Sequence, residues 1–322
     1  MKSQNYKSGV IVCIILVVLV LAGGFVSLFA VNSNNPSSEG SGFSLGKDYI
    51  GVLDISGTIE FSNNTYNQTW LLGEINRMKN DSKNVALVLR INSPGGAVYQ
   101  ADEVYLALQD YKTTGKPLYA YMQSMAASGG YYIACAANKI YANRNTLTGS
   151  IGVIAGQSFD VTQLLENLGI KSETIHAGKN KNMGNFNEPF SAEQRKIMQS
   201  IADECYEQFT AIVSNCRDIP LSKVISLADG RVYTAKQALN LGLIDNIDNF
   251  DNTINDLIQN EELKFDTKVN YFSFKAKTSF LQSFISGYSN LKNSEISSKL
   301  GIPLDVYNKL INHCDCPAFI YE

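Results

Sequence analysis

Histidine is scarce in this chain, with only two among its 322 residues. His313 lies in a stretch without clear periodicity, and His176 follows a short apolar run with no serine–histidine–aspartate context around it. A histidine-based triad therefore has little support, although His176 stays open as an alternative base. The formal net charge is only −3 and the pI is near 5.6, so electrostatics give no case for a nucleic-acid-binding protein.

The six cysteines do not form the pattern of a metal site. Cys314 and Cys316 lie beside His313, but a set of four ligands with suitable spacing is missing. Cys135 and Cys205 fall on apolar faces. We therefore expect buried or free thiols, with a disulfide near the C-terminus as the alternative, and we expect neither a metal nor a cofactor.

Charge is absent from one long segment, residues 10–31, which is dominated by Val, Ile and Leu. As a helix it would be about 33 Å long, enough to cross a bilayer core, whereas the apolar part of a cleavable signal peptide is usually shorter. Lys2 and Lys7 precede it, and the next positive residue is Lys47. These features predict a cytoplasmic segment at 1–9, a transmembrane anchor at 10–31, a flexible Ser/Asn/Gly-rich linker at 32–47 and an extracytoplasmic folded region.

Apolar runs of strand length alternate with helical patterns through residues 48–262, which predicts an α/β layered fold. Residues 263–322 show no clear period and are expected to be a C-terminal extension of unknown role. The predicted strands are Tyr49–Ile55, Val85–Ile91, Leu118–Met122, Ile140–Ala142, Ile151–Ile154, Glu173–Ile175 and Gly242–Asp245.

A long amphipathic helix is predicted to open at Ser191, where Ser-Ala-Glu-Gln resembles a capping box. Its apolar stripe is expected to be core. The stripe consists of Ile197, Ile201, Cys205, Phe209, Ile212 and Cys216. A shorter helix is predicted over Thr234–Leu241.

Ser128 follows a strand and precedes a small apolar helix. Free backbone N–H groups and the positive end of the helix dipole gather at such a junction. A hydroxyl there can attack a carbonyl while a neighbouring N–H stabilises the oxyanion. The alternative role for Ser128 is a simple helix N-cap.

The Gly95–Gly96 pair comes just after another strand, where glycine lets the backbone approach a ligand closely. It is either an ordinary turn or part of an oxyanion hole to which Gly129, next to the serine, adds a second donor.

A nucleophilic serine also needs a base. The Gly178–Lys181 stretch offers two lysines, Lys179 and Lys181. A lysine base must lose its proton against a free pKa of about 10.4. Ser150 is a neutral partner that could orient such an amine.

Several motifs in the same order resemble the signal peptide peptidase A family of serine–lysine membrane proteases, peptidase family S49. They are Asn92–Gly96, Ala127–Tyr132, Leu147–Val153 and Asp229–Thr234, and the similarity runs from about Ile50 to Asp248. The resemblance implies the ClpP/crotonase fold, a ββα superhelix. It also implies Ser128 as nucleophile, Lys181 as general base, Ser150 as the residue that orients the lysine, and the Gly95–Gly96 turn as the oxyanion loop.

With one copy of the core, the chain resembles the short family members, in which rings form and serine and lysine can meet across a subunit boundary. The resemblance therefore implies a membrane-anchored endopeptidase that degrades cleaved signal peptides or other membrane-associated peptides as a homo-oligomer. Two alternatives remain. A crotonase-like acyl-CoA enzyme would share the fold and an oxyanion hole without needing Ser128, and a catalytically silent membrane scaffold would need no nucleophile.

Overall fold

The computed structural model describes residues 47–157, 160–276 and 318–320. The predicted anchor at 10–31 lies outside these ranges. None of the helices within them combines the length and the hydropathy that crossing a bilayer requires.

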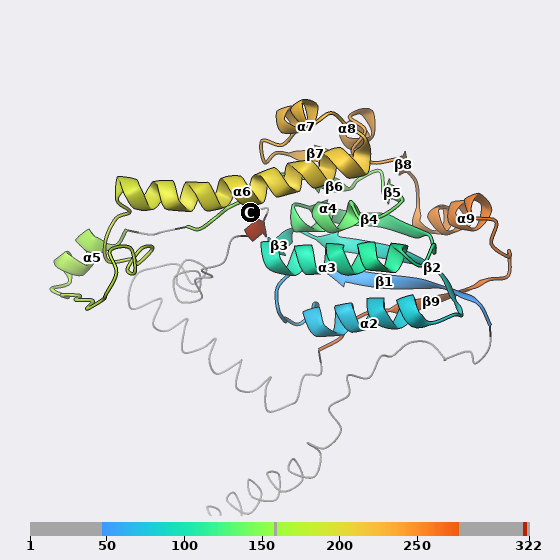
Figure 1. Ribbon diagram of the computed structural model, residues 1–322, viewed down its shortest axis with the longest axis horizontal. Helices are drawn as coiled ribbons and strands as arrows, with labels where there is room; N and C mark the ends of the chain where they lie inside the picture. The colour runs from blue at the N-terminus through green and yellow to red at the C-terminus, as the bar shows by residue number, and fades with distance from the viewer. Residues whose placement is uncertain (1–46, 158–159, 277–317, 321–322) are drawn as a thin grey trace, which may run out of the picture. The chain divides into compact units, whose positions relative to one another are not determined.

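Among the described residues, eight strands form one sheet, with its main path in the order β7-β6-β4-β2-β1-β9 (Figure 1). Neighbouring strands run parallel except β6 and β7, and β5 and β8 branch from β4. The strands are β1 (Tyr49–Ser56), β2 (Asn84–Ser93), β4 (Leu118–Ala127), β5 (Lys139–Ala142), β6 (Leu147–Gly149), β7 (Val232–Thr234), β8 (Asn246–Ile247) and β9 (Lys268–Phe272). The short strands β3 (Gly95–Ala97) and β10 (Ala318–Ile320) pair separately. The predicted α/β fold is confirmed.

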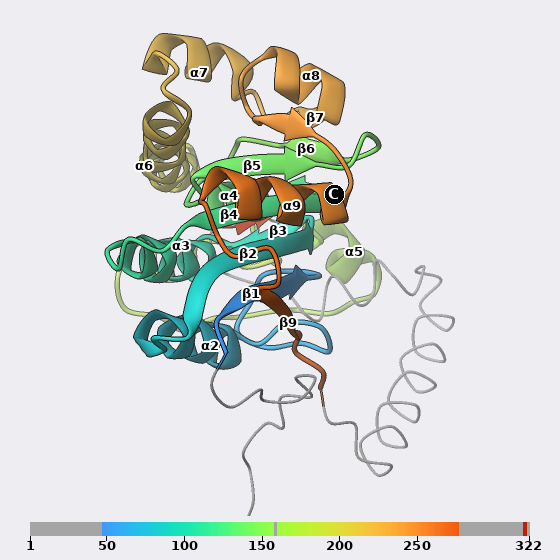
Figure 2. The same cartoon turned by 90° about the vertical axis from the view of Figure 1, so that its right-hand side faces the viewer.

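Helices cover both faces of this sheet, which explains why its central strands are apolar almost throughout. Leu53 and Ile55 of β1 pack with α2, α3 and α4, whereas Ile50 and Val52 point to the other face and pack with α9. Figure 2 shows α2 and α3 beside the stack of strands and α9 in front of it. The helices are α2 (Gln68–Asn80), α3 (Val98–Lys112), α4 (Gly129–Ala134), α5 (Thr162–Asn167), α6 (Ala192–Arg217), α7 (Leu221–Leu227), α8 (Ala235–Asn240) and α9 (Phe250–Asn260).

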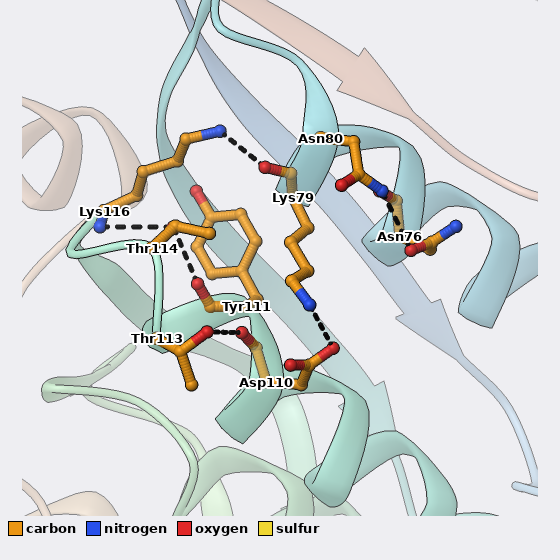
Figure 3. A network of polar contacts seen from close by, with 8 residues as sticks. All are labelled: Asn76, Lys79, Asn80, Asp110, Tyr111, Thr113, Thr114 and Lys116. Carbon is orange, nitrogen blue, oxygen red and sulfur yellow. Dashed lines mark hydrogen bonds and ion pairs between the residues drawn. The ribbon is translucent and has the colours of Figure 1, made fainter.

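Polar contacts join the C-terminal end of α2 to α3 (Figure 3). Lys79 forms a 2.6 Å ion pair with Asp110, and the Lys116 ammonium donates to the carbonyls of Met78, Lys79 and Asp81. The last carbonyls of a helix lack partners within the helix, so one lysine here satisfies several of them. These bonds hold together the two helices that flank β2, the strand that leads to the Gly95–Gly96 turn.

Three of the predicted strands are wrong. At Ile151–Ile154 the strand has already ended, because β6 stops at Gly149 and Ser150 adopts a positive φ of 49° that turns the chain. Gly242–Asp245 is also not a strand, since β8 begins only at Asn246. Glu173–Ile175 forms no strand, and its apolar member Ile175 is 95% exposed. These segments were predicted as strands from their apolar composition, but composition does not show where the backbone turns between elements.

The capping box at Ser191 is confirmed, and α6 runs for 26 residues from it. The prediction that its whole apolar stripe is core is wrong. Phe209 is fully buried, but Ile201, two turns earlier, is 36% exposed. Only the C-terminal half of α6 lies against the sheet domain, and Figure 1 shows its N-terminal half extending beyond α4.

The region after residue 262, for which the sequence offered no role, contributes two strands. β9 pairs in parallel with β1 at the end of the main sheet path. β10 pairs antiparallel with β3, the strand formed by Gly95–Ala97.

Candidate active site around Ser128

Ser128 occupies the turn between β4 and α4 in a strained backbone conformation, with φ 54° and ψ −118°. Its N–H donates to the Gly149 carbonyl at 2.7 Å, and its carbonyl accepts from the Tyr132 N–H at 2.9 Å. A non-glycine residue held at such angles costs of order 1–3 kcal/mol, and such residues cluster at functional sites. These two bonds hold the strained turn in place.

The Ser128 hydroxyl is fully buried, and its Oγ finds no hydrogen-bond partner among the described residues. The side chain makes no capping hydrogen bond to α4, which rules out the simple N-cap role. A buried hydroxyl without a partner costs about 1–3 kcal/mol. The site therefore keeps this group unsatisfied, as expected of a group whose partner is a reacting molecule.

The glycine pair lies directly beside the serine turn. A Cβ placed on Gly129 would lie 3.3 Å from the nitrogen of Gly96 and 3.4 Å from the Cα of Gly95. One placed on Gly130 would lie 3.1 Å from the Ser93 carbonyl. The structure thus brings together Ser128 and all three glycines of the predicted oxyanion hole.

The backbone N–H groups of Gly95 and Gly129 differ in whether they already have a hydrogen-bond acceptor nearby. The Gly95 N–H already donates to Ser93 Oγ at 3.1 Å, and Ser93 Oγ in turn donates to the Gly57 carbonyl at 2.7 Å. Gly129 is the first residue of α4, so its N–H has no acceptor within the helix. The Gly95 N–H is thus engaged within its own turn, and the oxyanion role of the three glycines stays a prediction, with Gly96 and Gly129 the donors favoured by this geometry.

The Gly96 N–H points away from the bridge that fixes its strand. Ile59 donates its N–H to the Gly95 carbonyl and accepts from the Ala97 N–H, both at 2.8 Å. Backbone groups alternate sides along a strand, so the N–H and carbonyl of Gly96 face the opposite edge. A Cβ on Gly96 would lie 1.9 Å from the Ile59 carbonyl oxygen, so only glycine fits this close approach.

Ser150 lies close to Ser128 through the backbone, because Gly149 accepts the hydrogen bond from the Ser128 N–H. Ser150 is buried, has a positive φ of 49° and donates its own N–H to the Arg231 carbonyl at 2.8 Å. It lines a pocket together with Tyr206 and Asp229. The structure therefore brings Ser150 and the nucleophile candidate into one region.

Lys181 lies in a different part of the fold from Ser128 and Ser150. Its side chain is exposed and lines a different pocket, together with Ala155, Phe190 and Met198, which includes neither Ser128 nor Ser150. Among the described residues, no hydrogen bond or ion pair of the Lys181 side chain is found. The neighbouring Lys179 forms an exposed ion pair with Glu193 in the first turn of α6. That hydrogen bond lowers the pKa of the Glu193 carboxyl.

Helix α6 passes both the Lys181 pocket and α4, the helix that follows Ser128, so distances along it show how far apart these two regions lie. Phe209 packs on Tyr132 of α4, with ring centroids 5.1 Å apart, whereas Met198 lines the pocket of Lys181. The two residues are 11 positions apart in α6, which corresponds to roughly 16 Å along the axis. Within one chain, the structure does not bring Lys181 to Ser128.

His176, the alternative base, is exposed, and its Nδ1 lies 3.1 Å from the Gly178 carbonyl oxygen. It belongs to the same segment as Lys181. The structure gives it no contact with Ser128.

Sequence analysis missed the residues that fix α4. The Tyr132 hydroxyl donates to Asp102 Oδ1 at 2.6 Å, and Gln208 Nε2 donates to that hydroxyl at 2.6 Å. Burial, followed by the bond to Asp102, raises the pKa of Tyr132. The bonds tie the helix behind Ser128 to both α3 and α6. In the sequence, Tyr132 lies in an apolar run, which indicates packing but not hydrogen bonding. Its partners Asp102 and Gln208 are distant in sequence, so no local pattern could identify them.

Residues 110–264 match the family model described as peptidase family S49. The chain belongs to peptidase family S49. The resemblance to the signal peptide peptidase A family is thereby confirmed. The S49 match includes Ser128, Ser150 and Lys181, and it ends close to Leu263, where the apolar periodicity also fades.

Three S49 relatives illustrate the similarity. A protein of Enterococcus faecium that carries the name signal peptide peptidase SppA is 33% identical over 220 residues, 68% of this chain and 64% of that protein. The chloroplastic serine protease SPPA of Arabidopsis thaliana is 34% identical over 218 residues, 67% of this chain and 32% of that protein. Protease 4 of Haemophilus influenzae is 30% identical over 270 residues, 80% of this chain and 43% of that protein.

The chain thus spans less than two thirds of the length of each of these relatives. The family and the names of the relatives support the prediction of a serine protease.

Proposed function

We propose that this protein is a membrane-anchored serine endopeptidase with Ser128 as its nucleophile and the ClpP/crotonase type of fold. The observation that carries the proposal is the Ser128 Oγ, buried and unpaired on a strained turn beside the N–H groups of Gly96 and Gly129. A crotonase-like enzyme would use the two N–H groups but has no need of a strained serine between them.

In the proposed reaction, the unprotonated amine of Lys181 takes the proton from Ser128 Oγ as the oxygen attacks the peptide carbonyl. The N–H groups of Gly96 and Gly129 hold the negative charge that develops on the carbonyl oxygen. The proton passes to the leaving amine as the peptide C–N bond breaks. Water then attacks the acyl-serine ester with Lys181 again as base, which releases the second product and restores Ser128.

Lys181 reaches the serine, in this proposal, from a neighbouring copy of the chain. Support comes from the separate pockets of Lys181 and Ser150, and from the roughly 16 Å along α6 between Met198, which lines the Lys181 pocket, and Phe209, which packs on α4. The segment that carries Lys181 also exposes apolar side chains, including Leu168, Ile170 and Ile175, which a neighbouring copy would cover. Ser150, near Ser128, would receive and orient the incoming amine. A homo-oligomeric ring satisfies all of these requirements.

The substrates we propose are cleaved signal peptides or other membrane-associated peptides. The apolar segment at 10–31 would hold the protease domain on the extracytoplasmic side of the membrane, next to such substrates. A reporter fused after Glu322 should then be active only in its extracytoplasmic form, and a reporter active in the cytoplasm would refute this topology.

A serine-reactive fluorophosphonate tests the proposed function. The full chain should form an adduct that peptide mass mapping places on Ser128, and Ser128→Ala should prevent it. An acyl-CoA enzyme and a silent scaffold both predict that Ser128 is not labelled. Labelling at another serine, with Ser128 unmodified in correctly folded protein, would refute the assignment.

A further inference from the structure

Two cysteines lie on neighbouring helices behind the Ser128 turn, and neither is part of a disulfide. Cys135 is the C-cap residue of α4 and is buried, whereas Cys216 lies in the last turn of α6 and is partly exposed. Phe209 of α6 packs on Tyr132 of α4. Tyr132 precedes Cys135 by about one helical turn, and Phe209 precedes Cys216 by about two. The two cysteines therefore lie on facing sides of the two helices, and both pack in one apolar cluster.

Hydrogen bonds fix the ends of these helices against the same loop. The Tyr131 hydroxyl of α4 donates to the Leu243 carbonyl at 2.8 Å. Arg217 of α6 donates its Nε to the adjacent Gly242 carbonyl, also at 2.8 Å. The parts of α4 and α6 that carry the cysteines are thus held close together by groups other than the thiols.

The thiols themselves meet between the helices. Cys216 Sγ donates to the Val213 carbonyl at 3.6 Å, and the Cys216 side chain also forms a hydrogen bond with the Cys135 thiol. A disulfide can form without backbone movement only where two cysteine side chains point toward each other at short range. Cys135 and Cys216 meet this requirement.

We propose that Cys135 and Cys216 form a redox-modification site, at which a small disulfide oxidant such as oxidised glutathione converts the two thiols into a disulfide that joins α4 to α6. Disulfides persist in oxidising compartments, and the proposed extracytoplasmic topology would place the domain in one. The inference goes beyond the proposed function, because thiol oxidation requires neither Ser128 nor peptide hydrolysis.

The exposure of the two thiols sets the order of the reaction. The Cys216 thiolate, which is the more accessible, attacks one sulfur of oxidised glutathione, and the glutathione S–S bond breaks to release one glutathione thiolate. The buried Cys135 thiol then loses its proton to solvent and attacks the Cys216 sulfur of the mixed disulfide, which releases the second glutathione. Two protein thiols are oxidised, and one glutathione disulfide is reduced to two thiols.

The disulfide would close a long loop, residues 136–215, which contains both Ser150 and Lys181. A cross-link lowers the conformational entropy of the unfolded chain, and the effect grows with the length of the loop. We therefore expect the melting temperature of the oxidised protein to lie roughly 5–15 °C above that of the reduced protein.

Disulfide mapping in the full chain tests the site. The reduced, folded protein is incubated with excess oxidised glutathione, its remaining thiols are alkylated in denaturant, and it is digested without reductant before mass spectrometry. The expected product is a peptide containing Cys135 joined to a peptide containing Cys216. Recovery of both cysteines as alkylated thiols would overturn the proposal.

Single variants test the order of attack. Cys135→Ala should retain glutathione on Cys216, because no second thiol is present to displace it. Cys216→Ala should leave Cys135 unmodified, because the Cys135 thiol is buried. Cys205→Ala is the matched control, since Cys205 lies earlier on α6 and should not affect the disulfide. Glutathione on Cys135 in the Cys216→Ala protein would overturn the assignment of Cys216 as the attacking thiol.

Thermal unfolding of the oxidised and reduced wild type measures whether the bond joins the helices, and this comparison does not depend on the folding of a variant. The rise on oxidation should be present in the wild type and in Cys205→Ala, and absent in Cys135→Ala. A wild type that carries the mapped disulfide but melts at the same temperature as the reduced protein would overturn the claim that the bond holds α4 to α6.

Discussion

Gly96 and Gly129 face each other across the turn that carries Ser128, so close that a Cβ on Gly129 would lie 3.3 Å from the Gly96 nitrogen. The two residues come from different strand–helix units, one after β2 and one after β4. Parallel pairing of β2 with β4 brings the ends of these units together. Two N–H groups and a strained serine are thereby gathered at one edge of the sheet.

Removing the nucleophile should stabilise the protein. Ser128→Ala deletes a buried hydroxyl that lacks a partner, and we expect a gain of about 1 kcal/mol or more in the free energy of unfolding. For a domain of this size, that gain corresponds to a melting temperature roughly 2–4 °C higher. Thermal unfolding followed by circular dichroism measures it.

Thr148→Val is the matched control for that change. Thr148 is also buried nearby, but its Oγ1 donates to the Ala126 carbonyl at 2.6 Å. Its loss should lower the melting temperature, because a buried acceptor is left unpaired. A Ser128→Ala protein that melts below the wild type would show that the hydroxyl has a stabilising partner.

The close approach of β3 to Ile59 predicts a specific effect of Gly96→Ala. The added methyl group would lie 1.9 Å from the Ile59 carbonyl oxygen, so the strand must shift and move the Gly96 N–H. We expect kcat to fall by about 10²-fold, the usual loss for one oxyanion donor. Steady-state hydrolysis of a fluorogenic peptide measures this loss.

Gly73→Ala provides the comparison for Gly96→Ala. Gly73 lies in α2, and a Cβ added there would have no neighbour within 4 Å, so alanine should stabilise the helix by roughly 0.5–1 kcal/mol and leave kcat unchanged. Similar kcat values for the two variants would contradict the role given to Gly96.

Variants of Lys181 test whether this residue is the general base. Lys181→Ala should lower kcat by about 10²–10⁴-fold, and Lys181→Arg should fare no better, because a guanidinium cannot accept the proton. Ser150→Ala should lose part of the rate if Ser150 orients the amine. Peptide hydrolysis rates of the purified variants measure these effects.

Two neighbours of Lys181 serve as controls. Lys179→Ala removes only an exposed ion pair with Glu193, so the rate should stay within a factor of roughly two. His176→Ala should also keep most of the activity, since the ring is exposed and its Nδ1 lies 3.1 Å from the Gly178 carbonyl oxygen. An inactive but folded His176→Ala protein, together with an active Lys181→Ala protein, would replace the lysine with a histidine mechanism.

The free energy of unfolding should fall as the pH rises into the alkaline range. Burial, followed by the contact with the Cys216 sulfur, raises the pKa of the Cys135 thiol well above its usual value. The native state therefore keeps the thiol neutral, and its contribution is fully present below the unfolded pKa of about 8.5. Above that pH the unfolded state loses a proton that the native state retains, which costs about 1.4 kcal/mol per pH unit until the native pKa is reached.

The variant Cys135→Ala isolates this contribution. Denaturant titrations between pH 8 and 10 should show a shallower decline of the unfolding free energy in Cys135→Ala than in the wild type. Identical slopes would mean that the thiol does not contribute to the pH dependence.

The sequence predicted the elements that are strongly patterned, and it failed where the backbone turns. The apolar run at Val85–Ile91 and the capping box at Ser191 correspond to β2 and α6. The turn at Ser150 was missed, because the positive φ of a non-glycine residue leaves no mark in composition. The partly exposed stripe of α6 was also missed, since periodicity shows that a face is apolar but not what covers it.

The site was predicted as a set of residues but not as an arrangement. Ser128 and the neighbouring glycines could be recognised, since each follows a strand of one parallel sheet. The direction of each glycine N–H could not be predicted, because the Gly95 N–H donates to Ser93 Oγ and the orientation of Gly96 is fixed by Ile59, which comes from another loop. The distance between the pockets of Lys181 and Ser150 depends on the direction of α6, which the sequence does not specify.

Mixing Ser128→Ala protein with Lys181→Ala protein tests the central claim, an active site built from two copies of the chain. Each variant alone should be inactive. After subunit exchange at equal concentrations, random assembly pairs an intact serine with an intact lysine at one boundary in four, so about a quarter of the wild-type rate should return, with native mass spectrometry to confirm mixed assemblies. Mixed assemblies that remain inactive would contradict the account.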